Sequence, residues 1–230
     1  MKGKTNIWAI VPAAGVGARM QTDRPKQYLS VGGKTILEHS LSALLEFDMV
    51  AGVQLCLSAQ DGYWSDIDFQ HEKLLPIVDG GERRADTVLA GLKALEKHVR
   101  EDDWVMVHDA ARPCITSALL TRLVDSVMES DVGGILATPV ADTLKQTQHG
   151  DVIHKTIDRE MLWSAQTPQM FRYALLVNCL EKALADNLQI TDEASALEAS
   201  GYQPMLVPSS RHNIKVTYPE DIAWVEYILA

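Results

Sequence analysis

The sequence predicts an α/β fold, Rossmann-like, with a mostly parallel sheet flanked by helices. Short apolar runs of strand length alternate with segments of helical periodicity, which is the pattern of βα units in a parallel sheet. The 230 residues are enough to bury a large core without disulfides. No repeat, low-complexity tract or linker divides them, so we expect one domain over residues 1–230.

The elements follow in order along the chain. Short apolar runs predict buried strands at 7–11, 53–57, 104–107 and 134–137, and a late strand at 214–216. Apolar residues three and four apart predict helices at 37–45, 88–99, 120–127, 173–184 and 191–199, and a last helix opening at Pro219.

The alternation is interrupted between about 138 and 163. This stretch is polar and carries a turn signal at Gly150-Asp151, with short strand-like segments at 143–146 and 152–155 on either side. We therefore expect a β-hairpin that leaves the α/β domain as an arm.

Composition limits the partners. Lys and Arg number 21 against 31 Asp and Glu, a net charge of −10, so we expect no nucleic acid as a partner. No apolar run approaches the roughly 20 residues of a membrane span, so we expect no membrane partner. The three cysteines have neither disulfide nor zinc spacing, which favours a reducing cytoplasmic location.

The strongest local signal is the run of small residues that follows the first strand. Two glycines and three alanines between Pro12 and Ala18 let the backbone approach a ligand, and successive N–H groups can hold phosphate oxygens. The spacing fits neither a dinucleotide fingerprint nor a Walker A loop, and a plain tight turn is the alternative. Arg19 and Lys26 follow closely, and a glycine loop with two cations suits a triphosphate.

Three further clusters could carry chemistry. His108, Asp109 and Arg112 end a buried strand, where ligands bind in parallel sheets; Asp109 could instead cap a turn. The glycine turn at 79–87 leads into a helix and suits a base or ribose, although a solvated helix start is the alternative. Lys215 stands in an apolar segment, where a charge is costly unless it is paired.

Together these motifs resemble the 2-C-methyl-D-erythritol 4-phosphate cytidylyltransferase family. The resemblance rests on segments that occur in the family's order over nearly the whole chain: Pro12–Gly15 with Arg19, Pro25–Tyr28, Val107–Arg112, Thr191–Ala194 and Asn213–Thr217. It implies a nucleotide-diphospho-sugar transferase-like domain whose β-arm forms a homodimer.

The resemblance also implies the reaction. CTP and 2-C-methyl-D-erythritol 4-phosphate would give 4-diphosphocytidyl-2-C-methyl-D-erythritol and pyrophosphate in isoprenoid precursor biosynthesis by the non-mevalonate pathway. The substrate phosphate would attack the α-phosphate in line. The implied cofactor is Mg²⁺, with other divalent cations as substitutes, held mainly by the triphosphate and with Asp109 as a candidate protein ligand.

Residue roles are carried over position by position. The implied catalytic residues are Arg19, Lys26, Arg159 and Lys215. The implied CTP-binding residues are Pro12, Ala13, Ala14, Gly15, Gly17, Gly81, Glu82 and Thr87. The implied substrate-binding residues are Asp109, Ala110, Arg112, Thr143 and Thr191. The chain departs from the family at Glu82-Arg83, where relatives often carry acidic pairs.

Two alternatives stay open on the sequence. A ribitol-5-phosphate cytidylyltransferase would share the glycine loop, the 107–112 segment and both lysines. A non-catalytic nucleotide-binding regulatory module would share the fold, and loss of Lys26 or Arg19 would be its signature; both residues are present.

Overall fold

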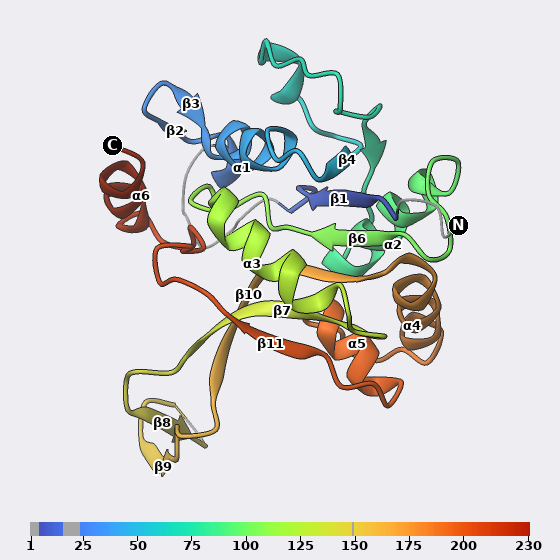
Figure 1. The fold of residues 1–230 in the computed structure, drawn as a ribbon. Helices are drawn as coiled ribbons and strands as arrows, with labels where there is room; N and C mark the ends of the chain where they lie inside the picture. Colours follow the sequence, from blue (N-terminus) through green and yellow to red (C-terminus); the bar gives the residue numbers. More distant parts are fainter. Residues whose placement is uncertain (1–4, 16–23, 149) are drawn as a thin grey trace.

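The computed structural model describes residues 5–15, 24–148 and 150–230. Its centre is a seven-stranded sheet in the order β11-β7-β10-β6-β1-β4-β5 (Figure 1). The strands of this sheet are β1 (Ile7–Pro12), β4 (Val50–Leu57), β5 (Val78–Asp79), β6 (Trp104–Val107), β7 (Gly133–Pro139), β10 (Trp163–Arg172) and β11 (Met205–Pro208). Neighbouring strands run parallel except at β10, which is antiparallel to both β6 and β7. The mostly parallel α/β fold expected from the sequence is confirmed.

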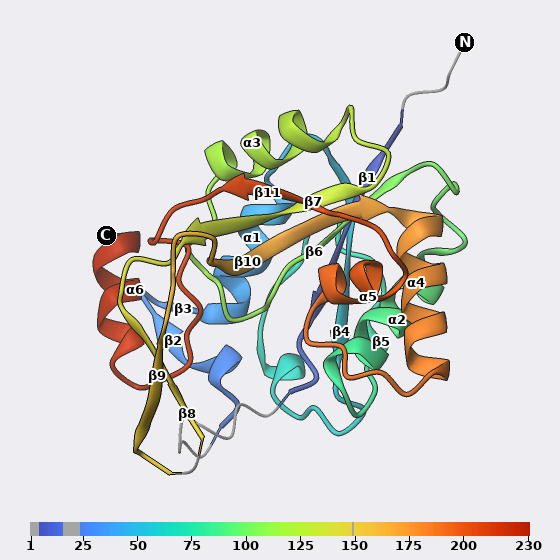
Figure 2. The ribbon, with the colours of Figure 1, turned by 90° about the horizontal axis from the view of Figure 1, so that it is seen from below.

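Helices cover both faces of the sheet. Figure 2 shows α3 on one side and α4 and α5 on the other. The helices are α1 (Ile36–Leu45), α2 (Arg84–Leu95), α3 (Ser117–Val127), α4 (Tyr173–Ala185), α5 (Glu193–Ala199) and α6 (Asp221–Leu229), with short 3-10 turns η2 (Lys26–Tyr28) and η3 (Trp64–Asp66).

Strand β1 shows how the two layers are filled. Its alternate residues Ile7, Ala9 and Val11 pack into the core beneath α1 and α3. Trp8 and Ile10 face the other way and pack into the core beneath α2, α4 and α5. Because both faces are buried, the strand is continuously apolar, and for this reason the sequence pattern locates it well.

The predicted arm is present as a two-stranded antiparallel sheet. Strands β8 (Leu144–Thr147) and β9 (Ile153–Ile157) pair with Leu144 opposite Ile157. The arm projects beyond the layered body (Figures 1 and 2), and its chain returns directly into β10. A second small sheet joins β2 (Ser30–Val31) to β3 (Lys34–Thr35), next to α1.

One predicted element is wrong. Residues 214–216 form no strand; they run as extended chain outside the sheet. Their backbone groups bond elsewhere: the Val216 N–H donates to the Ala111 carbonyl, and the Val216 carbonyl accepts from Lys26 Nζ at 2.8 Å. The strand in this part of the chain is β11, which the sequence pattern did not indicate. The helix predicted to 99 also ends earlier, at Leu95.

Within the described ranges, no helix is long and apolar enough to cross a membrane.

Candidate active site

The functional residues gather at the carboxyl ends of β1, β5 and β6. A cavity of about 240 Å³ opens there between the loop after β1, the start of α2 and the segment after β6. We call it the loop cavity. Its lining includes the sequence-predicted residues Pro12, Ala13, Ala14, Gly15, Lys26, Gly81, Glu82, Thr87, Asp109, Ala110 and Lys215. This edge of a parallel sheet is where ligands bind in open α/β folds.

Buried side chains fix the backbone of the loop cavity. The Gln27 amide donates from Nε2 to the carbonyls of Ala13 and Gly15, at 3.0 and 3.2 Å. On the opposite wall, the Thr87 hydroxyl accepts from the Gly81 N–H at 3.1 Å. The backbone that would face a nucleotide is therefore held before any ligand arrives.

A second cavity of about 250 Å³ adjoins the first. We call it the β10 cavity, because Ala165, Gln166, Thr167 and Gln169 of β10 contribute to its lining. Its other lining residues are Arg84, Asp109, Arg112, Thr191, Asp192 and Lys215. Arg84, Asp109 and Lys215 line both cavities and so form the wall between them.

Asp109 is the centre of that wall. Lys215 Nζ lies 2.7 Å from Asp109 Oδ2, and the Arg84 guanidinium lies 3.0 Å from Asp109 Oδ1. Arg112 Nε is 3.7 Å from Oδ2. Burial would raise the pKa of the Asp109 carboxyl, but the charges of Arg84, Lys215 and Arg112 outweigh burial and hold this pKa well below its usual range. Asp109 is therefore ionised at any physiological pH.

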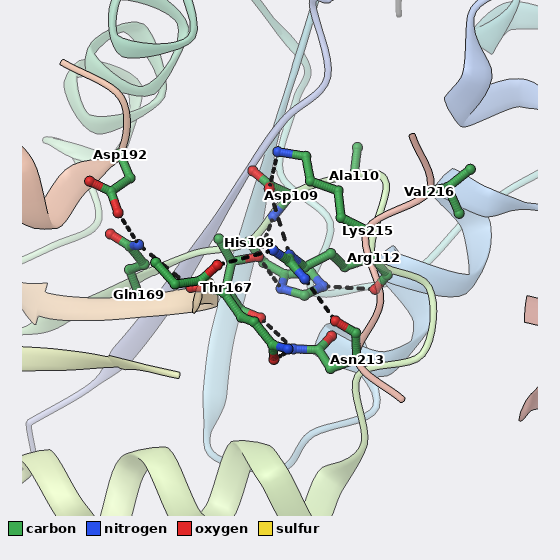
Figure 3. A network of polar contacts seen from close by, with 12 residues as sticks. His108, Asp109, Ala110, Arg112, Thr167, Gln169, Asp192, Asn213, Lys215 and Val216 are labelled. Carbon is green, nitrogen blue, oxygen red and sulfur yellow. Dashed lines mark hydrogen bonds and ion pairs between the residues drawn. The ribbon is translucent and has the colours of Figure 1, made fainter. Parts of the chain in front are cut away.

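His108 is buried beneath this cluster and is neutral (Figure 3). Thr167 Oγ1 accepts from the Asp109 N–H at 3.0 Å, so its own proton is directed to His108 Nδ1 at 3.1 Å. The other ring nitrogen, Nε2, then donates to the Arg112 carbonyl at 3.1 Å. Both nitrogens are satisfied in the neutral ring, and burial lowers the pKa of His108 to about 4. The geometry therefore supports a structural role for His108 as a satisfied histidine of the core.

Arg112 and Asn213 hold the segment that carries Lys215. Arg112 Nη1 donates to the Asn213 carbonyl at 2.7 Å. The Asn213 amide donates to the Thr167 carbonyl at 2.8 Å and to Gln166 Oε1 at 3.0 Å (Figure 3). These bonds fix the extended chain beside β10, which positions the Lys215 side chain at the wall.

Four predicted site residues are not placed in either cavity. Arg19 and Gly17 lie outside the described residues. Thr143 and Arg159 lie on the exposed arm and are not among the residues that line the two cavities of the same chain.

Sequence reasoning missed five residues that build the site: Arg84, Glu193, Gln27, Thr167 and Gln169. Arg84, Glu193 and Gln27 stand in motifs that the sequence singled out, whereas Thr167 and Gln169 lie in β10, which the sequence pattern did not indicate. All five act on partners outside their own local segment. Glu193, for example, fits the first turn of a helix, and nothing local shows that its carboxylate is buried against Arg84.

The comparison with known proteins decides the family. Residues 7–230 match the sequence profile of 2-C-methyl-D-erythritol 4-phosphate cytidylyltransferase. The protein of that name from Aliivibrio fischeri is 48% identical over 97% of this chain and 94% of the relative. The Francisella tularensis crystal structure of that name has a TM-score of 0.86 at 34% identity, covering 97% of this chain and 100% of that one. A crystal structure of 4-diphosphocytidyl-2C-methyl-D-erythritol synthase has a TM-score of 0.85 at 38% identity, covering 99% of both chains.

The chain belongs to the 2-C-methyl-D-erythritol 4-phosphate cytidylyltransferase family.

Membership confirms the reaction class expected from the sequence, cytidylyl transfer in the isoprenoid pathway. It does not favour the ribitol-5-phosphate enzyme or the non-catalytic module. The family is one of nucleotidyltransferases, which generally use a divalent metal ion.

The described residues do not form a cluster that would hold such an ion. Among them, no three His, Cys, Asp or Glu side chains come together. Asp109, the candidate ligand, is already surrounded by Arg84, Lys215 and Arg112. A divalent cation would meet their repulsion, so the described part of the chain does not fit a metal site of its own at Asp109.

Proposed function

We propose that the two adjoining cavities bind the two substrates of cytidylyl transfer. CTP occupies the loop cavity, and the phosphate of 2-C-methyl-D-erythritol 4-phosphate enters the β10 cavity. The observation that carries this proposal is the shared wall of Arg84, Asp109 and Lys215, because groups bound in the two cavities meet there.

The reaction needs no covalent intermediate on the protein. An oxygen of the substrate phosphate attacks the α-phosphorus of CTP in line, a new P–O–P linkage forms, and the bond to the bridging oxygen of the β-phosphate breaks. Pyrophosphate leaves with the electron pair. Catalysis then rests on positioning and on stabilising the charge that builds up around the α-phosphorus.

Two pairs of cations fit these tasks. Lys26 and Arg19 stabilise charge on the α-phosphoryl group, and Lys215 and Arg159 hold the attacking phosphate. Lys26 Nζ donates to the carbonyl of Val216, the residue next to Lys215, so the two lysines approach the wall together. Mg²⁺ bound to the triphosphate would supply further neutralisation of the phosphates.

The remaining predicted residues provide contacts to the two substrates. The small residues of the loop after β1, with the turn before α2, select a pyrimidine through backbone contacts. Asp109, Ala110, Arg112 and Thr191 surround the methylerythritol, and Thr143 joins them from the arm. Thr191 and Arg112 both line the β10 cavity, which supports this assignment.

We propose that the arm completes the site of a second subunit in a homodimer. An isolated two-stranded hairpin is marginally stable in water. This one also leaves apolar side chains exposed, with Val152 at 75%, Ile153 at 59% and Met161 at 89%. Pairing two arms about a two-fold axis would bury this surface and bring Arg159 and Thr143 toward the partner's β10 cavity.

Subunit exchange tests the shared site. Lys26→Ala and Arg159→Ala are each expected to be inactive alone. If Arg159 acts in trans, a mixture that exchanges subunits regains activity, because half of the sites in each heterodimer contain both residues. A mixture that exchanges subunits and stays inactive would show that Arg159 acts within its own chain.

We further propose that residues 1–230 act as one nucleotidyltransferase domain in the cytoplasm, with no nucleic-acid or membrane partner. The net charge of −10 and the absence of paired cysteine spacing support this setting.

Pyrophosphate release tests the function directly. The protein is incubated with CTP and either 2-C-methyl-D-erythritol 4-phosphate or ribitol 5-phosphate, with each substrate alone as control. Release is expected only with CTP and the methylerythritol phosphate together. Pyrophosphate release with ribitol 5-phosphate but not with the methylerythritol phosphate would show that ribitol 5-phosphate is the substrate. Release with neither alcohol phosphate would favour the non-catalytic nucleotide-binding module.

A further inference from the structure

Arg84 joins the shared wall to a buried carboxylate, Glu193 at the start of α5. Its guanidinium faces Glu193 in a two-pronged pair, with Nη1 to Oε1 at 2.6 Å and Nη2 to Oε2 at 3.1 Å. The same guanidinium donates from Nε to Asp109 Oδ1 at 3.0 Å. The Glu193 side chain is 1% exposed and the Arg84 side chain 27%, so the carboxylate of this pair is removed from solvent.

We propose that Arg84, held by Glu193, is the positioning residue that orients Asp109 and thereby aims the ammonium of Lys215 at the attacking phosphate. This inference rests on the proposed function, and it assigns a task to two residues that touch neither substrate in the scheme above.

The division of contacts on Asp109 shows how the orientation is set. Arg84 contacts Oδ1, whereas Lys215 contacts Oδ2. With one oxygen fixed by a planar guanidinium, the carboxylate cannot rotate about its terminal bond without breaking that contact. Lys215 therefore meets an oxygen whose place is determined from the other side.

Arg84 is better suited to holding Asp109 in place than to binding a phosphate. It donates from all three of its nitrogens to two carboxylates, so its charge and its planar fork are engaged. The Lys215 side chain is 39% exposed and makes its ion pair at one point, which leaves its other N–H donors directed to the cavities.

Glu193 is itself rigidly placed. Gln169 of β10 uses both ends of its amide on the residues that flank it: Nε2 donates to Asp192 Oδ2 at 2.8 Å, and Oε1 accepts from the Ala194 N–H at 2.9 Å. Figure 3 shows Gln169 reaching Asp192. A positioning pair requires a rigid anchor of this kind, because any displacement of the Glu193 carboxylate would move Arg84 and with it Asp109.

The test measures pyrophosphate release and CTP binding in Glu193→Gln. The substitution keeps the size of the side chain and removes its charge. We expect kcat to fall about 10- to 100-fold, the effect of a small misplacement of a reacting group, while the dissociation constant for CTP changes less than about twofold. The matched control is Glu181→Gln: Glu181 on α4 also pairs with a residue of α2, Lys93, but in solvent, and its kcat should stay at the wild-type value.

A double variant separates positioning from a structural role. If Glu193 acts through Lys215, adding Glu193→Gln to Lys215→Ala should lower the remaining rate no further. A wild-type kcat in Glu193→Gln, or the same fold-loss with and without Lys215, overturns the inference. Arg84→Lys keeps the charge but cannot span both carboxylates, so its kcat should fall as much as that of Glu193→Gln. If circular dichroism shows that Glu193→Gln is unfolded, Arg84→Lys is used for the test in its place. Lack of pyrophosphate release by the wild type would instead refute the proposed function.

Discussion

The buried His108 makes the stability of the fold depend on pH. The ring is fully buried and neutral, and its pKa is about 4 in the folded protein against an ordinary value of 6.5. As the pH falls below 6.5, the unfolded chain takes up a proton at this ring and the folded protein does not. The free energy of unfolding therefore falls from that point down to a pH near 4, below which both states are protonated.

The size of the effect follows from the two pKa values. At 1.36 kcal/mol per pKa unit, the difference of about 2.5 units corresponds to about 3.4 kcal/mol over the whole window. Between about pH 8 and about pH 5, where the folded ring is still neutral, the expected loss is about 2 kcal/mol.

Urea unfolding of the wild type and of His108→Gln over this pH range measures the effect. The glutamine amide can still donate to the Arg112 carbonyl, as the ring does. Other titrating groups contribute to the pH dependence of both proteins and cancel when the slope of the variant is subtracted from that of the wild type. One of them is Glu193, whose pKa is raised by burial and whose contribution has the opposite sign. His212→Gln, at an exposed position, should keep the wild-type slope. An unchanged slope in His108→Gln would refute the argument.

Three further outcomes concern the reaction. Lys26→Ala should lower kcat by about 100-fold or more and weaken CTP binding much less, with Arg19→Ala expected to match; loss of binding in proportion to kcat would contradict the catalytic role. Excess EDTA should abolish turnover, and unchanged turnover would show that no divalent ion is needed. In Gly80→Ala the new Cβ would lie 2.7 Å from Ala14 Cβ and 2.8 Å from Thr87 Cγ2, so the KM for CTP should rise about tenfold. The control Gly62→Ala, which has open space around the new Cβ, should leave this KM unchanged. An unaltered KM in Gly80→Ala would mean that the cavity walls move aside without cost.

The sequence predicts best those elements whose burial is visible in the local pattern of apolar and polar residues. Strands β1 and β6 are buried on both faces, so their residues are continuously apolar and the runs are unmistakable. The arm is recognised by its turn and its polar strands. Extended chain at 214–216 has the same alternation as a strand, but its backbone is bonded by side chains such as Lys26, which no local pattern reveals.

The same limit applies to the site. Residues proposed to contact a ligand through the backbone or through charge, such as Gly15 and Lys26, stand in motifs that can be recognised from the local sequence. Strand β10 was not recognised, because Thr167 and Gln169 point their polar side chains inward to hold other segments and so break the apolar pattern of a central strand. The pairing of Arg84 with Glu193 spans 109 residues, and only the folded chain brings them together.

The distance in sequence between Lys26 and the segment that carries Lys215 has a consequence for synthesis of the chain. Lys26 and the Val216 carbonyl that it binds are 190 residues apart. At the speed of a ribosome, the second is made about 10 to 40 seconds after the first. Every strand of the main sheet precedes residue 213, so a nascent chain can assemble the sheet before the segment that carries Lys215 exists. A fragment that stalls there lacks Lys215 and the carbonyl that holds Lys26, so nucleotide should stabilise it against unfolding less than it stabilises the finished protein.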